Sequence, residues 1–259
     1  MVLADAINII SRNGGAFASR WAHVVVGITW IGLLYYFNFV QVPSFAEMEA
    51  AARNNTIDKL ASRALWWFRW AAAATVATGI MLLLFEGGNG SKIELTNGDY
   101  WKSIEGMSIA TGILLALTMF FNVWLVIWPN QKKVIANARN VQAGGEADPS
   151  AAAAGRKAGL ASRQNTIFSF TMLMYMVGTA HFFSASSGFV QSPSSSDRAT
   201  YWIIAVVIWL AFELNALGVL GGTAANVTNW MYESHRNALV TGALLVIAYY
   251  AVFYLVLKS

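Results

Sequence analysis

Residues Trp21 to Pro43 read WAHVVVGITWIGLLYYFNFVQVP, an apolar stretch with one histidine, His23, near its start. A helix needs about 20 apolar residues to cross a bilayer, and this stretch is long enough. A second apolar run, TMLMYMVGTAHFF from Thr171 to Phe183, carries His181 near its end. If the two helices run antiparallel, the two histidines lie at the same depth in the membrane.

The composition of the chain is typical of an integral membrane protein. Of its 259 residues, 57% are hydrophobic and only 12% are charged, which is outside the usual range of a soluble domain. The net charge of +4 resides in the segments between apolar runs. This distribution favours topology signals over nucleic-acid binding. The chain has no cysteine, so disulfides, thiolate metal sites and covalent attachment of a c-type haem are excluded.

We therefore predict an all-α fold, a polytopic bundle of about six transmembrane helices that forms a single membrane domain over residues 1–259. Residues 1–20 are expected to be an outer N-terminal segment, with an interfacial helix at Ala4 to Ile10 and no signal peptide. Residues 129–165, with the sequence AGGEADPSAAAAGRKAG at their centre, are expected to be a flexible cytoplasmic linker between two three-helix halves. The expected spans are Trp21–Val40, Ala64–Phe85, Met107–Trp128, Thr166–Phe183, Tyr201–Gly221 and Ala238–Leu257.

The orientation follows from the distribution of lysine and arginine. Of the 17 such residues, eleven fall on one side of the expected spans and six on the other. The positive-inside rule then places both termini in the periplasm of a bacterial inner membrane. Tryptophans such as Trp66 and Trp128 are interpreted as interfacial anchors. Arg69 is expected to extend towards the cytoplasmic lipid phosphates, with an anionic ligand as the alternative.

The two histidines are the main candidates for chemistry. Gly27 follows His23 by four residues and Gly178 precedes His181 by three, so each histidine has a glycine on its own helix face. This arrangement leaves room for a porphyrin. Two histidines on antiparallel helices can bind a b-type haem from both sides of the iron. We therefore predict His23 and His181 as haem ligands and Gly27 and Gly178 as cofactor-binding residues.

Alternatives remain open for these residues. Glycine is also common where membrane helices pack closely, and each histidine can instead form hydrogen bonds near a hydrated interface. The third histidine, His235, is expected in a loop at the opposite side of the membrane.

A second polar group lies deeper. Glu213 and Asn215 fall near the middle of the fifth expected helix, and Asn122 lies in the third. A carboxylate at this depth is rarely left unpaired, so these residues are a possible proton or substrate site. The alternative is a neutral Glu213 that links neighbouring helices by hydrogen bonds. No catalytic residue is assigned.

Three segments resemble a known family: HVVVGITWIGLLYYFNFVQVP in the first helix, FNVWLVIWPNQKKVI at the end of the third and ASRQNTIFSFTMLMYMVGTAH in the fourth. They are similar to the urate oxidase N-terminal-domain family of bacterial membrane proteins. In that family a cytochrome c domain follows the membrane domain, and urate oxidation is coupled to the respiratory chain. The resemblance implies a membrane redox component with His23 and His181 at motif positions. The first helix also resembles haem-binding membrane oxidases of porphyrinogen metabolism, which again implies haem at His23.

The sequence ends at Ser259 without a cysteine, so we expect the cytochrome to be a separate chain. The leading hypothesis is a haem b protein that transfers electrons at the outer face of the inner membrane, with a c-type cytochrome or respiratory complex as partner. The alternatives are the membrane subunit of a urate-type heterocycle oxidase, a cofactor-free accessory subunit of a larger complex or oligomer, and a transporter. Whether the chain is itself an enzyme stays open.

Overall fold

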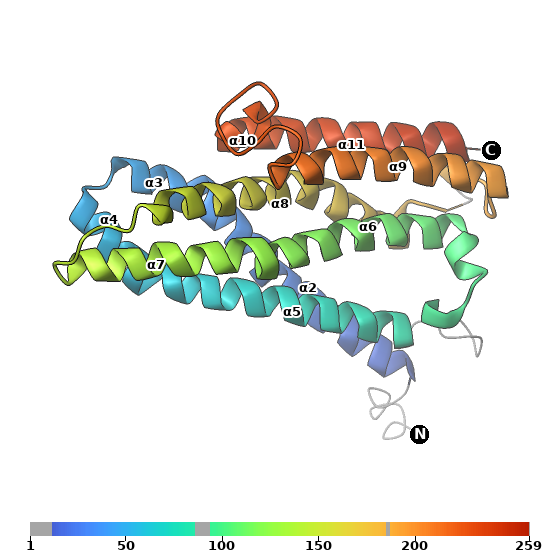
Figure 1. Ribbon diagram of the computed structural model, residues 1–259. Helices are drawn as coiled ribbons and strands as arrows, with labels where there is room; N and C mark the ends of the chain where they lie inside the picture. The colour runs from blue at the N-terminus through green and yellow to red at the C-terminus, as the bar shows by residue number, and fades with distance from the viewer. Residues whose placement is uncertain (1–11, 86–93, 185–186, 259) are drawn as a thin grey trace, which may run out of the picture.

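The computed structural model describes residues 12–85, 94–184 and 187–258. In these ranges the chain is helical, and its one pairing of extended residues is an isolated bridge between Phe189 and Lys258. The long helices lie side by side along one axis, and the start of α2 and the end of α11 lie at the same end of the bundle (Figure 1). We call this the terminal end and the opposite one the distal end. The expected interfacial helix at residues 4–10 lies outside the described residues.

The first two expected spans form an antiparallel pair. We call a series of helical elements that follow one another directly a rod. In each of these two rods a π-helical segment joins the long α-helix to a short one. Pro43 lies in the first turn of α3, where a missing N–H costs little. Since α2 begins at Arg12, residues 12–20 are part of the first helix and not of a separate outer segment. The elements are α2 (Arg12–Tyr35), η2 (Tyr36–Gln41), α3 (Val42–Glu47), α4 (Ala50–Thr56), η3 (Ile57–Ala61) and α5 (Ser62–Phe85).

The third rod starts from two short 3₁₀ turns, η5 (Glu94–Thr96) and η6 (Tyr100–Lys102). The Ser103 hydroxyl caps it by accepting a hydrogen bond of 3.1 Å from the Gly106 amide, which satisfies one of the free donors of a helix N-terminus. The rod consists of α6 (Ile104–Phe121), the π-helical η7 (Asn122–Ile127) and α7 (Trp128–Gln142).

The prediction of a flexible linker over residues 129–165 is wrong for most of that range. Helix α7 runs to Gln142 and α8 (Ser150–His181) begins eight residues later, so the connection is only a short turn with Gly144 at a φ of 85°. The alanine-rich sequence SAAAAGRKAG has high intrinsic helix propensity. Its alanines at 151, 154 and 158 repeat with helical spacing and are buried, so this segment is a packed helix.

The last part of the chain contains α8, α9 (Ser195–Ala216), α10 (Trp230–Glu233) and α11 (His235–Leu257). The fifth expected span is shorter than predicted, because α9 ends at Ala216 and not at Gly221. Gly218 and Gly222 have φ angles of 80° and 67°, a backbone conformation that glycine adopts readily and that ends a helix.

Five helical stretches among the described residues are long and apolar enough to cross a membrane: Gly14–Glu47, Ala50–Phe85, Ile104–Gln142, Ser195–Ala216 and His235–Leu257. The fourth expected span lies in α8, which has 32 residues but is less apolar. Helix α8 contacts α6, α7, α11 and, less extensively, α2, α9 and α10. Because other helices surround it, α8 needs fewer apolar side chains than a helix that faces lipid.

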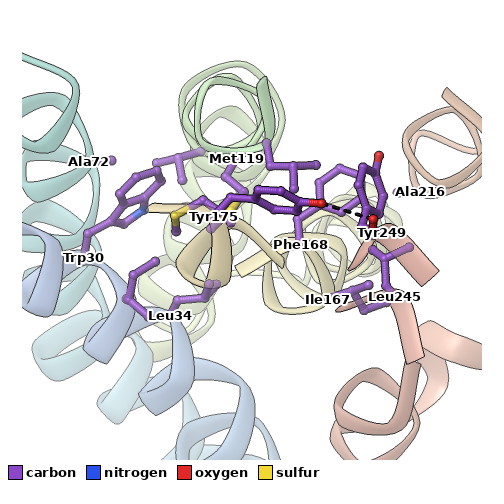
Figure 2. Packing of buried hydrophobic residues seen from close by; sticks show 14 of the residues in the cluster. Trp30, Leu34, Ala72, Met119, Ile167, Phe168, Tyr175, Ala216, Leu245 and Tyr249 are labelled. Atoms are coloured by element: carbon purple, nitrogen blue, oxygen red, sulfur yellow. Dashed lines mark hydrogen bonds between the residues drawn. The ribbon is translucent and has the colours of Figure 1, made fainter. Parts of the chain in front are cut away.

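The core follows α8 from one side of the bundle to the other. Trp30 and Leu34 of α2 lie on one side of it and Tyr249 of α11 on the other (Figure 2). Tyr175 of α8 donates a hydrogen bond of 3.1 Å to the Tyr249 carbonyl and stacks on Phe183 with ring centroids 5.0 Å apart. These buried aromatic contacts connect α8 with α11 and with the segment that follows α8.

The turn before α6 gives a test of this packing. A Cβ atom at Gly106 would lie 1.8 Å from the Tyr100 carbonyl oxygen, whereas a Cβ atom at Gly32 would meet no atom within 4 Å. We expect Gly106→Ala to destabilise the protein by about 1–3 kcal/mol, the usual cost of overpacking. Gly32→Ala should leave stability unchanged or slightly raised. Thermal unfolding in detergent, followed by circular dichroism, measures both; equal melting temperatures would contradict the packing described for this turn.

Candidate functional site

The two predicted haem ligands lie near the terminal end of the bundle. Helices α2 and α8 run in opposite directions (Figure 1), and the Tyr35 hydroxyl lies 2.9 Å from the Ser169 hydroxyl. His23 lies twelve residues before Tyr35, and His181 lies twelve residues after Ser169. With a rise of about 1.5 Å per residue, both histidines are at about the same distance from this contact.

The His23 ring faces α5. Its Nδ1 lies 2.9 Å from the Thr75 carbonyl oxygen and 3.1 Å from the Thr78 hydroxyl. A carbonyl only accepts, so Nδ1 carries the proton and the Nε2 lone pair is left for another partner. Histidines that bind a metal through Nε2 are commonly oriented in this way. A Cβ atom at Gly27 would lie 4.0 Å from the Thr75 side chain, an ordinary van der Waals contact, so the packing of α2 on α5 does not require glycine at this position.

The surroundings of Gly178 differ from those that a porphyrin would need. The amides of Phe182 and Phe183 both donate to the Gly178 carbonyl, at 2.7 and 2.8 Å, so the chain turns back at the end of α8. A Cβ atom at Gly178 would lie 2.5 Å from the buried Phe183 ring. Phe183 therefore fills the space that the sequence analysis assigned to the cofactor, and the His181 side chain is exposed.

His23 is thus oriented as an axial haem ligand would be. A haem between His23 and His181 does not fit this conformation, because Phe183 occupies the space beside Gly178. Among the described residues no three His, Asp or Glu side chains come together as a metal site. A haem with two axial histidines does not require such a group of three. Paired haem ligation stays a prediction, and we derive no electron-transfer step through it.

The deeper polar group is a hydrogen-bonded network between three helical rods. The Asn122 amide donates to Asn165 at 3.0 Å and to the Glu213 carboxyl at 3.2 Å, and the Asn165 amide donates to the Met119 carbonyl at 2.9 Å. All three side chains are buried. Asn215 is not part of this network: its amide donates to the Thr228 carbonyl at 2.7 Å, and its oxygen is buried without a partner.

A cavity of about 280 Å³ near the distal end was not anticipated from the sequence. We call it the distal cavity. It is lined by residues of η2, α3, α5, η7, α7, α8 and α10: Phe37, Asn38, Gln41, Val42, Leu65, Phe68, Ile127, Gln131, Gly155, Arg156, Ala158, Gly159, Ser162, Arg163, Tyr232 and Glu233. Its volume is just below the usual range for small-molecule sites, roughly 300–1,000 Å³, and suits a small ligand.

The charges in the distal cavity do not cancel. Arg156 donates through both terminal nitrogens to the Glu233 carboxylate, which leaves this pair neutral. Arg163 donates to the Tyr232 carbonyl at 2.7 Å, so its positive charge is not matched by a carboxylate within ion-pair distance among the described residues. The side-chain oxygen of Gln41 is buried without a partner, and a buried polar atom of this kind is usually satisfied by water or a ligand.

Tyr232 lies between the distal cavity and the deeper network. It lines the cavity, and its hydroxyl donates to the Gln164 side chain at 2.7 Å and lies 3.1 Å from the carbonyl of Phe212, the neighbour of Glu213. Burial, with a smaller contribution from the negative charge of Glu213, raises the pKa of Tyr232 well above its usual value. Its hydroxyl therefore stays protonated and acts as a donor at neutral pH.

Arg156 and Arg163 were missed because they were counted only as topology signals in a supposed linker. The signal that could have identified them is their separation of seven residues, which puts both on one face of a helix. Gly155 and Gly159 share that face at a separation of four residues. A Cβ atom at Gly159 would meet nothing within 4 Å, so this glycine leaves part of the distal cavity open.

The Asn122 contacts give a second test of stability. We expect Asn122→Ala to destabilise the protein by about 1–3 kcal/mol, because it leaves buried polar groups of Asn165 and Glu213 without a partner. The matched control is Asn130→Ala, since within the described residues the Asn130 amide donates only to the Val126 carbonyl, four residues earlier in the same rod. Thermal unfolding in detergent should show a clearly larger loss for Asn122→Ala; equal losses would count against the network.

No curated protein and no solved structure matches this chain. One family model does, over residues 100–214, from η6 to near the end of α9. The matched range contains Asn122, Gly178, His181 and Glu213, together with the two arginines of the distal cavity, whereas His23 and Gly27 lie outside it. The resemblance expected from the sequence is thereby confirmed over this range: residues 100–214 match the urate oxidase N-terminal family.

Proposed function

We propose that this chain is the membrane component of an oxidoreductase and binds a small polar heterocycle, such as urate, in the distal cavity. A c-type cytochrome or another component of the respiratory chain would accept the electrons. The family match supports a connection with urate oxidation. The observation that carries the proposal is the distal cavity itself, in which Arg163 has no carboxylate within ion-pair distance among the described residues and a buried amide oxygen of Gln41 has no hydrogen-bond partner.

The chemistry of the cavity suits a planar, anionic ring. Phe37 and Phe68 offer aromatic surface, and their own rings meet edge to face with centroids 5.4 Å apart. The Arg163 guanidinium has five N–H donors in a plane and uses only some of them within the chain, so it can bind a carbonyl or a delocalised anion. Gln41 can accept from a ring N–H. Urate presents carbonyl oxygens, N–H groups and a delocalised negative charge at neutral pH.

The charge distribution supports an inner-membrane location with the distal end in the cytoplasm. Most lysines and arginines of the chain lie at or near this end, as the positive-inside rule expects for the cytoplasmic side. The distal cavity would then receive its ligand from the cytoplasm, and the terminal end, with His23 and His181, would face the periplasm.

The ligand proposal is tested by equilibrium dialysis of radiolabelled urate against the detergent-purified chain. We expect Arg163→Gln to weaken binding about tenfold or more, because a hydrogen bond to a charged group contributes about 1.5–3 kcal/mol. Gly159→Leu should block binding by filling the cavity. Its matched control is Gly32→Leu, at an exposed glycine where a Cβ atom would likewise meet no atom within 4 Å. Unchanged binding in Gly159→Leu, or equal losses in both leucine variants, would refute the assignment.

A second candidate function, electron transfer through haem b, is favoured by the orientation of His23. Its Nδ1 is held by Thr75 and Thr78, and its Nε2 is left for a ligand at about the depth of His181. A porphyrin between the two histidines would require Phe183 to leave Gly178. If neither urate nor haem binds, an accessory subunit is the remaining interpretation.

The haem hypothesis is tested by the visible spectrum of the purified protein, oxidised and then reduced with dithionite. The haem hypothesis predicts a sharp reduced α-band, typical of six-coordinate haem b, that disappears in both His23→Ala and His181→Ala. His235→Ala is the matched control, since His235 lies at the distal end against Phe39. A normal haem spectrum in either of the first two variants would exclude ligation by that histidine.

A further inference from the structure

A second hollow, of about 610 Å³, lies between α5 and α7 near the distal end. We call it the basic pocket. Four cationic side chains and two tryptophans line it, together with Ser62, Ile135 and Ala136: Arg63, Trp66, Arg69, Trp128, Lys132 and Arg139. It shares no lining residue with the distal cavity.

One of the four cations is already neutralised. Arg139 forms an ion pair with Asp58, which also binds Lys59 at 2.8 Å. In the part of the chain that the structure describes, Arg63, Arg69 and Lys132 have no carboxylate within ion-pair distance. Three positive charges around one hollow repel each other, and an anion between them would relieve this repulsion.

Arg69 is the cation of the basic pocket for which a bound ligand would supply a missing hydrogen-bond partner. The Cζ atom of its guanidinium lies 3.7 Å from the centroid of the Trp128 ring, and the Nζ atom of Lys132 lies 5.7 Å from the same centroid. One terminal nitrogen of Arg69 is buried and has no hydrogen-bond partner. A buried charged donor without a partner is costly, whereas a planar guanidinium held by an aromatic ring is already oriented for an oxygen anion.

The surroundings of the basic pocket indicate an amphipathic occupant. Trp66, Trp67 and Trp70 expose 46%, 60% and 48% of their surface, and exposed tryptophans near the ends of membrane-spanning helices are typical of the lipid headgroup level. Further towards the membrane centre, Phe121 and Leu125 of the adjacent rod are also exposed. Acyl chains could lie along this apolar surface while a phosphate enters the pocket.

We propose that the basic pocket binds the phosphate of an anionic phospholipid headgroup, as basic hollows between transmembrane helices on the cytoplasmic side commonly do. Arg69 and Lys132 contact the phosphate, Arg63 adds positive charge at the rim, and the acyl chains run over Trp66 and Trp70. This proposal is independent of the ligand of the distal cavity.

The test is native mass spectrometry of the full chain in a mild detergent, titrated with phosphatidylglycerol. We expect wild type to retain phosphatidylglycerol in preference to phosphatidylcholine, and Arg69→Gln and Lys132→Gln to weaken retention about tenfold. Lys133→Gln is the matched control, because Lys133 is the exposed neighbour of Lys132 and does not line the pocket. Arg69→Lys should retain the lipid better than Arg69→Gln and less well than wild type, since it keeps the charge and loses the planar stack.

A second measurement separates binding from folding and lipid from free phosphate. Without added lipid the variants should melt at the temperature of wild type. Phosphatidylglycerol should raise the melting temperature of wild type and Lys133→Gln clearly more than that of Arg69→Gln and Lys132→Gln. Equal retention by Arg69→Gln and Lys133→Gln would overturn the proposal, as would equal retention of phosphatidylcholine. Equal protection by inorganic phosphate would also overturn it and assign the pocket to a free anion.

Discussion

The structure depends on the enclosure of α8 by other helices. This helix carries amide and hydroxyl side chains along the middle of its length, among them Gln164, Asn165 and Ser169, which are buried. Each of these side chains would cost free energy if it faced lipid, because hydrocarbon offers no hydrogen-bond partner. In the bundle they find partners on other elements: Asn165 binds Asn122, Gln164 binds Tyr232, and Ser169 contacts Tyr35. The remaining helices are therefore arranged around α8, and their outer faces can remain apolar.

Because α8 is enclosed on several sides, it carries residues of both the distal cavity and the deeper network. Helix α8 contributes Arg156, Gly159 and Arg163 to the distal cavity. Asn165, two residues after Arg163, accepts a hydrogen bond from Asn122, which also donates to Glu213. Tyr232 lines the cavity and lies close enough to Glu213 for the carboxyl charge to act on its hydroxyl. A ligand in the cavity would thus lie one side chain away from a buried carboxyl group, an arrangement that allows the state of one to affect the other.

The basic residues at the distal end have two separate consequences. As a group they set the expected orientation in the membrane through their number alone. Individually they line two distinct hollows: Arg156 and Arg163 belong to one, and Arg63, Arg69 and Lys132 to the other. In each hollow one arginine is neutralised by a carboxylate and another cation is not, so each has a net positive charge. A count of charges along the sequence does not distinguish these roles, because it contains no information on which charges face each other.

The sequence by itself determined that the chain is a helical membrane protein, where most of its helices lie, and that His23 and His181 fall at similar depth, because apolar run length and helical rise are local properties. It also placed Asn122 and Glu213 at a depth where polar side chains need partners. Only the tertiary structure decided which way each side chain points. His23 faces Thr75 of α5, Phe183 occupies the space beside Gly178, and the expected linker packs as α7 and α8. These outcomes depend on contacts between segments far apart in the chain, which set the rotation of each helix about its axis and which periodicity does not specify.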